Sequence, residues 1–178
     1  MATTHNDLHD DLNPNIVIRK GWGDEISIKY RTNLKEKHCT VSREVDIVEA
    51  SKDAYDQLSF LHYRGSRITG PWKYYKMVRR GELVGVIVYT YPSVGGAVRK
   101  QTVGYSPSID ELNRDWALIS RVIIYPKYRG IGLGSRLIKE TLPLQGRKHV
   151  ELVAVMAQYN PFAEKAGMRL ISVRGPHK

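Results

Sequence analysis

The stretch from Trp116 to Met156 constrains the fold more than any other part of the chain. It holds a nearly unbroken apolar run, "WALISRVIIYP" (116–126), then a glycine-rich turn, an apolar stripe at helical spacing, and a second apolar run, "HVELVAVM" (149–156). Strands buried on both faces have this composition, and they belong to parallel or mixed sheets. The order strand, turn, helix, strand therefore predicts a βαβ unit within an α/β (α+β) fold.

Three glycines alternate within the turn, Gly130, Gly132 and Gly134, and Arg129 directly precedes them. The turn delivers the chain to a helix N-terminus, where backbone N–H groups lack partners and the helix dipole is positive. Residues without a Cβ let an anion approach this backbone closely, so the pattern predicts a phosphate-binding turn. The spacing G-x-G-x-G differs from the dinucleotide fingerprint G-x-G-x-x-G, and no P-loop pattern occurs in the chain.

Shorter patterns predict the other elements. Period-two alternation and turn residues predict strands over 15–20, 25–32, 39–50, the two arms of 71–92, and 168–174. Apolar residues at helical spacing predict helices over 51–65, 133–142 and 160–167, the last with Asn160 as its N-cap. The segment 93–115 is predicted to be a long polar connection.

The net charge of +10 is concentrated in the half of the chain that holds the glycine turn. Residues 99–178 carry 14 Lys and Arg against 6 Asp and Glu, which leaves +8. This excess favours a polyanionic partner, although basic residues also serve solubility alone. The single cysteine, Cys39, and the lack of an apolar run of membrane-spanning length predict a protein of the reducing cytoplasm. A polar, acidic tail over 1–14 is predicted to be disordered, and its His5 and His9 to bind no metal.

The residues "VIIYPKYRGIGLGSRLIKE" resemble the acetyl-CoA site of the GNAT superfamily of N-acyltransferases. In that family a strand ending in V-x-P precedes R/Q-x-x-G-x-G/A and a helix; here Ile124-Tyr125-Pro126 and then Arg129 occupy these places. The order of elements over 44–174 agrees, and "NPFAEKAGM" is similar to the family's last helix. More weakly, "LHYRGSR" is similar to the acetyltransferase-like domain fused to some ABC-type ATPases. The resemblance implies a GNAT-like mixed central sheet flanked by helices over 44–178, with a strand extension over 15–43.

The resemblance also implies which residues hold acetyl-CoA. Backbone amides of the turn would bind the pyrophosphate, and the end of the preceding strand would pair with the pantetheine arm. The implied cofactor-binding residues are Val122, Ile123, Ile124, Arg129, Gly130, Ile131, Gly132, Leu133, Gly134 and Ser135.

The catalytic groups are less clear, because the family's usual tyrosine acid falls on Ala163, which has no proton to donate. Tyr159 is the nearest replacement, and a packing role for it is the alternative. Ser120 could position a water and His62 could act as a base. The alternatives are a serine bonded to its neighbour and a solvated loop histidine. On the acceptor side we expect His62, Tyr63 and Arg64.

Acetyl transfer from acetyl-CoA to an amine is the function that these features predict. The basic charge suggests an acceptor on RNA or on a protein associated with nucleic acid, and a small molecule or a protein also fits. The family usually closes with two strands after its last helix, whereas one strand is predicted here, over 168–174. An N-terminal strand could take the place of the missing strand, or a second chain could do so in a homodimer, and the extra strands over 15–31 allow either. The alternative, which Ala163 favours, is a GNAT fold that binds CoA or nucleic acid without transfer.

Overall fold

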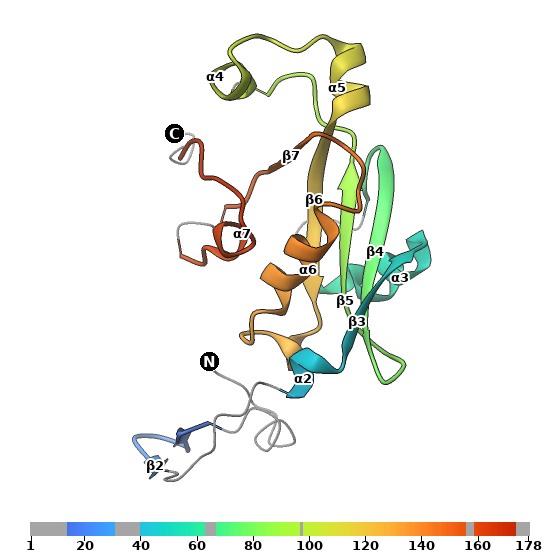
Figure 1. The fold of residues 1–178 in the computed structure, drawn as a ribbon. Helices are drawn as coiled ribbons and strands as arrows, with labels where there is room; N and C mark the ends of the chain where they lie inside the picture. Colours follow the sequence, from blue (N-terminus) through green and yellow to red (C-terminus); the bar gives the residue numbers. More distant parts are fainter. Residues whose placement is uncertain (1–13, 31–39, 63–66, 97, 156–158, 174–178) are drawn as a thin grey trace.

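The computed structural model describes residues 14–30, 40–62, 67–96, 98–155 and 159–173. Five strands form a central sheet in the order β3-β4-β5-β6-β7 (Figure 1). They are β3 (Val45–Ala50), β4 (Pro71–Arg79), β5 (Glu82–Thr90), β6 (Trp116–Ile124) and β7 (His149–Leu152). Neighbouring strands run antiparallel except β6 and β7, which are parallel. The predicted α/β fold with a mixed central sheet is confirmed.

One face of this sheet is covered by α6 (Leu133–Thr141), the helix that connects β6 to β7 (Figure 1). Leu137 and Ile138 are fully buried and share a cluster with Ile87 and Tyr89 of β5. The short helix α7 (Phe162–Lys165) also packs against α6. The predicted βαβ unit is thus present, and its helix begins where the glycine turn ends.

The opposite face is covered by α3 (Lys52–Leu58), which continues into a 3-10 helix, η2 (Ser59–Leu61). Consecutive residues of β5 point to opposite faces of the sheet, so Val86 and Val88 lie on the face opposite to that of Ile87 and Tyr89. Tyr55 of α3 is buried against these two valines. No helix among the described residues has both the length and the apolar composition that a membrane span requires.

Several predicted element bounds are wrong. The first residues of 39–50 form a helical turn, α2 (Thr40–Arg43), and this turn puts Val41 into the core. The predicted helix over 51–65 is too long: after α3 the chain tightens into η2, and His62 is already extended. Similarly, α7 begins after Pro161, so Asn160 is not its N-cap.

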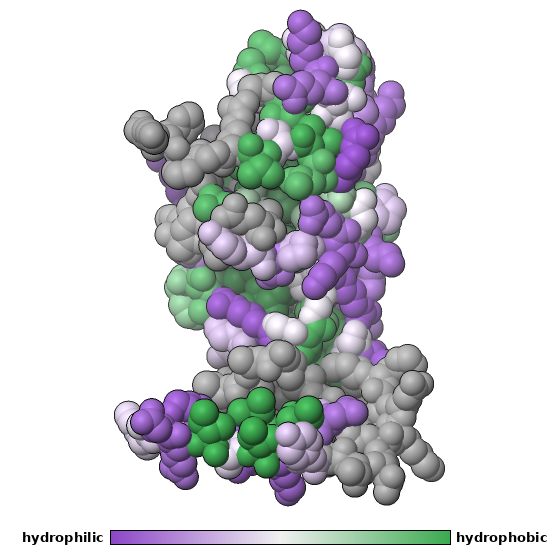
Figure 2. Space-filling model, turned by 90° about the vertical axis from the view of Figure 1, so that its left-hand side faces the viewer, coloured by the Kyte–Doolittle hydropathy of each residue, from purple (hydrophilic) through white to green (hydrophobic). Residues whose placement is uncertain are grey.

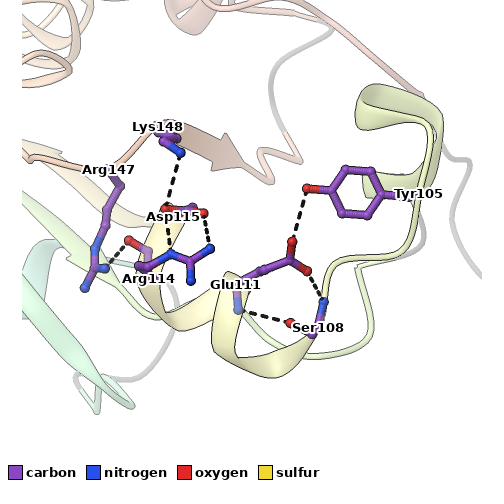
Figure 3. A network of polar contacts seen from close by, with 7 residues as sticks. All are labelled: Tyr105, Ser108, Glu111, Arg114, Asp115, Arg147 and Lys148. Carbon is purple, nitrogen blue, oxygen red and sulfur yellow. Dashed lines mark hydrogen bonds and ion pairs between the residues drawn. The ribbon is translucent and has the colours of Figure 1, made fainter.

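The segment 93–115 is not a plain polar connection, because it contains α4 (Arg99–Val103) and α5 (Ile109–Asp115). Figure 3 shows why α5 begins where it does. The Ser108 hydroxyl accepts from the Glu111 amide at 3.2 Å, and the Glu111 carboxylate accepts from the Ser108 amide at 2.8 Å. This capping box follows the pattern S-x-x-E, a helix signal that was present in the sequence.

The strands predicted near the N-terminus are present, whereas the strand predicted near the C-terminus is not. β1 (Ile16–Lys20) and β2 (Ile26–Tyr30) confirm two N-terminal strands, which pair with each other in a sheet of their own. The predicted last strand is wrong for residues 168–173, which are not in a strand. Their alternating pattern has no buried face, since Leu170, Ile171 and Val173 are all exposed. The tail over 1–13 lies outside the described residues.

Ionisation of Tyr89 should lower the stability of this core at alkaline pH. Burial raises the pKa of Tyr89 to about 12, from an ordinary value near ~10, and its hydroxyl bonds Thr141 Oγ1 at 2.7 Å. The folded state holds the phenol proton more tightly than the unfolded state does. The contribution of Tyr89 to the free energy of unfolding is therefore complete below pH ~10 and is lost as the pH rises to about 12.

We therefore expect Tyr89→Phe to flatten the alkaline loss of stability. Urea unfolding at a series of pH values should show the wild type losing roughly 2–3 kcal/mol more than the variant between pH ~9 and ~12. At pH 7 the variant should be less stable by about 1 kcal/mol, the usual cost of one lost hydrogen bond. Parallel pH profiles for the two proteins would contradict this assignment.

Candidate functional site

A free backbone edge at the end of β6 is the first component of the site. β7 pairs only with Trp116–Ile119, whereas β6 continues to Ile124. On the β7 side, the last five residues of β6 therefore have no strand partner within the described chain. An open edge of this kind presents N–H and C=O groups that can pair with an extended ligand.

The direction of these groups follows from the pairing with β5. The Tyr125 amide donates to the Val84 carbonyl at 2.8 Å, so it points toward β5. Because successive residues of a strand direct their backbone groups to alternate edges, Val122 and Ile124 direct theirs to the free edge. The Ile124 carbonyl accepts there from Arg129 Nε at 2.8 Å.

A β-bulge at Ser120 lies where β6 and β7 part. The register pairs Val88 with Arg121 and Tyr89 with Ile119, which leaves Ser120 as an extra residue. Bulges bend a strand and increase its local twist. This one also shifts the alternation, so that Ile119 before it and Val122 after it contribute to the same core cluster.

Unbroken alternation would place Ser120 on the same side of β6 as Val122 and Ile124, and the bulge interrupts this alternation. Ser120 Oγ instead accepts from Arg121 Nη1 at 3.3 Å, and the Ser120 carbonyl accepts from the same nitrogen at 2.8 Å. These contacts agree with the alternative considered for this residue, a serine bonded to its neighbour, and its role in positioning a water stays a prediction.

The glycine turn is the second component of the site, and it joins β6 to α6 through a short 3-10 helix, η3 (Pro126–Tyr128). Gly130 and Gly132 have φ values of 82° and 87°. Side chains disfavour this left-handed region, so the fold of the turn requires glycine at both positions.

Gly134 differs from these two, since its φ is not positive and an added Cβ would lie 3.8 Å from Ile124 Cγ1, an ordinary contact. Nothing in the packing of the described chain requires glycine there.

Six consecutive backbone amides line this turn, from Gly130 to Ser135. None of them donates a hydrogen bond to an acceptor within the described residues, and the first helical bond runs from the Arg136 amide to the Gly132 carbonyl at 3.1 Å. The helix N-terminus adds partial positive charge. Such a row of unpaired donors forms a nest for an anion.

The turn is held in place from two sides. Arg129 bonds back to the end of β6, as described above. On α6, Arg136 donates to the Ser42 carbonyl, to the Val45 carbonyl at 3.1 Å, and to Glu140 at 2.6 Å. This guanidinium therefore ties the start of α6 to the junction of α2 and β3.

Gly85 is a site residue that the sequence reasoning missed. It lies opposite Ile124 in the β5–β6 register, and a Cβ on it would approach the Ile123 carbonyl to 2.8 Å and Ile124 Cδ1 to 2.6 Å. Gly85 thus lets β5 support the end of β6 closely. A glycine inside the apolar run "LVGVIV" was the available signal.

The side chains considered for acid–base catalysis lie on separate elements. His62 is half-buried at the C-cap of η2, and its amide donates to the Ser59 carbonyl at 3.1 Å. Tyr159 precedes α7 and is 73% exposed, and Ala163 is half-buried within α7. Tyr63 and Arg64 lie outside the described residues. The roles of His62, Ser120 and Tyr159 remain predictions.

No protein-family model matches the sequence, and no curated protein sequence matches it. Solved structures do resemble the fold. An aminoglycoside acetyltransferase from an uncultured soil metagenomic sample, in complex with sisomicin, has a TM-score of 0.50 at 13% identity, over 78% of this chain and 98% of that one. Aminoglycoside N-acetyltransferase AAC(6')-Iy, in complex with a bisubstrate analog, has a TM-score of 0.51 at 11% identity, over 75% and 97%.

The same enzyme in complex with CoA has a TM-score of 0.50 at 12% identity, over 75% of this chain and 98% of that one. At these identities the likeness concerns the fold. This chain has the fold of the GNAT-type acetyltransferases, as its glycine turn predicted.

Proposed function

We propose that this chain is an N-acetyltransferase that binds acetyl-CoA in the glycine turn and along the free edge of β6. The carrying observation is a row of six amides, Gly130 to Ser135, that directly follows the end of β6. Within the described residues these amides have no acceptor, and this end of β6 has no strand partner on one side. CoA combines a pyrophosphate with an arm that contains two amide bonds. A nest of donors suits the first part, and an open strand edge suits the second.

The chain's own residues fit this ligand. Val122 and Ile124 direct backbone groups to the free edge, where the arm would pair as an added strand. Gly134 would contribute its backbone amide to this row, and its packing within the described chain would also accept an alanine. The +8 balance of residues 99–178 favours an anionic ligand in this half of the chain.

When bound, acetyl-CoA would supply a thioester, whose acyl group an amine can attack. The chain must then provide donors and proton acceptors around the reacting carbon. The Ile124 amide lies at the free edge and is our candidate donor to a developing oxyanion. An amine with a lysine-like pKa near ~10.4 must lose a proton before it attacks, and His62 is our candidate base.

The acceptor is proposed to be an amine that enters on the side of His62, Tyr63 and Arg64. Two proteins of the same fold are known in complexes with sisomicin and with a CoA-acetylneamine bisubstrate analog, which supports a small amine as a first choice. The basic surface keeps an acceptor borne by RNA or by another protein as an alternative.

A second candidate function is binding of CoA without transfer. The observation that favours it is Ala163 on α7, at the place where the family resemblance implies a proton donor. Tyr159 could replace that donor only by moving close to the leaving thiolate, and its side chain is largely exposed.

We expect Gly132→Ala and Gly134→Ala to affect CoA binding differently. At Gly132 the φ of 87° makes any side chain costly, by about 1–2 kcal/mol, and the turn must change shape. At Gly134 an alanine fits without strain. Calorimetry should show at least a roughly tenfold loss of CoA affinity for Gly132→Ala and less than a roughly threefold loss for Gly134→Ala.

A third variant, Gly132→Asp, adds a carboxylate to the proposed anion nest and should abolish binding. Circular dichroism and thermal unfolding must first show that each variant is folded. Unchanged CoA affinity in a folded Gly132→Asp protein would place the cofactor elsewhere.

For the acceptor side, we expect a double replacement of His62 and Arg64 by alanine to leave CoA affinity within about twofold, because neither residue belongs to the turn. Turnover with sisomicin, or with whichever amine in a panel is acetylated, should fall by about 10²-fold or more if His62 is the base. Loss of CoA affinity in the folded double variant would argue against this placement.

For the acid, we expect Tyr159→Phe to reduce turnover by about 10²-fold at unchanged CoA affinity, because only a hydroxyl is removed. Tyr105→Phe, on the segment between α4 and α5, is the matched control and should keep full activity. Near-normal turnover of Tyr159→Phe would remove Tyr159 from the mechanism. A wild type that binds CoA but acetylates no amine offered would favour the binding function.

A further inference from the structure

The N-terminal hairpin of β1 and β2 has one continuous apolar face. The antiparallel register sets Ile18 opposite Ile28, with Ile16 opposite Tyr30 at one end and Lys20 opposite Ile26 at the other. Paired residues point to the same side of a two-stranded sheet. This face, which we call the isoleucine face, consists of Ile16, Ile18, Ile26, Ile28 and Tyr30.

The isoleucine face is uncovered by any described part of the chain. Its exposed fractions run from 51% for Ile16 to 69% for Tyr30, and Trp22 in the connecting turn is 96% exposed. Figure 2 shows the resulting apolar band across the lowest part of the molecule, where Figure 1 places the hairpin. Apolar patches of this kind on soluble proteins mark contact surfaces.

The hairpin also needs a partner for its own stability. It pairs with no strand of the central sheet, and an isolated two-stranded hairpin is at best marginally stable in water. The segments that flank it, 1–13 and 31–39, are dominated by polar and charged residues, and their large apolar residues are one methionine and three leucines. By composition these segments offer few large apolar side chains compared with the four isoleucines and the tyrosine of this face.

We propose that the isoleucine face binds the same face of a second copy of this chain, with a two-fold axis near the central Ile18–Ile28 pair. The face is apolar except at one end, where Lys20 lies opposite Ile26 and its Nζ donates to the Gly23 carbonyl of the connecting turn. An apolar face of this kind is complementary to itself, as an isologous interface requires. The charged residues Arg19 and Lys29 alternate onto the other side of the hairpin, so that pairing of the isoleucine faces does not bury them.

The available area is sufficient for a reversible dimer. An isoleucine side chain offers roughly 100 Å² and an aromatic one roughly 200 Å². Scaled by their exposed fractions, the five residues and Trp22 amount to roughly 550 Å² per copy. Two copies would bury roughly 1,100 Å², which is at the lower end of specific interfaces and fits a dissociation constant of about micromolar size.

The charge of the chain gives this interaction a distinctive salt dependence. Each copy carries +10, so two copies repel one another at long range, while the interface itself is apolar. Added salt screens the repulsion and strengthens apolar association. The dimer should therefore become tighter between ~50 and ~300 mM NaCl, opposite to the behaviour of a basic protein bound to an acidic partner.

The test is sedimentation equilibrium of the full chain and of two variants that differ in one face of the hairpin. Ile18→Glu puts a charge at the centre of the isoleucine face and should raise the dimer dissociation constant by about 100-fold or more. Ser27→Glu puts the same charge on the opposite face and should leave the constant within about threefold. CoA binding, measured on both variants, should be unchanged, which separates this proposal from the proposed function.

A cross-link provides a second readout. In a Cys39→Ser background, which removes the only native cysteine, Ile28→Cys should form a disulfide-linked dimer under mild oxidation, and Ser27→Cys should not. A wild type that stays monomeric at ~100 μM, equal dissociation constants for the two glutamate variants, or equal cross-linking of the two cysteine variants would overturn the proposal. Binding of the monomer to lipid vesicles through the same isoleucines would also overturn it.

Discussion

The parting of β6 from β7 after Ile119 is the constraint on which the rest of this structure depends. Parallel strands in a sheet normally continue to pair, and a free edge inside a sheet leaves backbone groups without partners. Here the extra residue Ser120 bends β6 at the point where the pairing ends. Among the described residues, the open edge is therefore a product of the register between β5, β6 and β7.

The glycine turn would be of little use without the contacts that fix it relative to this edge. Arg129 bonds the carbonyl of Ile124, so the residue that directly precedes the proposed anion nest is tied to the last residue of β6. Arg136 ties the start of α6 to α2 and β3 on the other side. Gly85 lets β5 approach the same strand end from behind. Three separate parts of the chain thus hold one row of amides in place, and preorganised donors of this kind bind an anion without a cost of reorganisation.

Sequence patterns predicted the elements whose signals are local. The apolar run before the turn, the stripe of α6 and the two antiparallel arms of 71–92 were all correct, because each depends on neighbouring residues. The bulge at Ser120 could not be predicted, since it is a property of the register between two strands. The strand predicted over 168–174 failed for a similar reason: alternation shows that a segment suits a sheet, but not that an edge is available to pair with it.

The site was predictable to the extent that it is made of backbone. Glycines at fixed spacing identified this turn from the sequence, and Gly130 and Gly132 have the left-handed conformation that favours glycine. Their part in holding a cofactor stays a prediction. Side-chain chemistry is different, because its geometry is assembled from distant segments. His62 follows the helix on one face of the sheet, whereas Tyr159 precedes a helix on the other, and no spacing in the sequence relates them.

A bidentate ion pair between Arg99 and Glu151 joins α4 to β7, the strand that leaves the open edge of β6 uncovered. Glu151 lies on β7 opposite Leu118, and its carboxylate accepts from Arg99 at 2.6 and 3.0 Å. Arg99 is only 4% exposed and lies over the ring of Trp116, so its charge depends on this partner. The ion pair attaches the segment 93–115, which contains α4, to the part of the sheet in which β6 and β7 pair. This segment is therefore anchored beside the end of β6 and β7 at which the two strands pair, and the glycine turn follows the other end of β6.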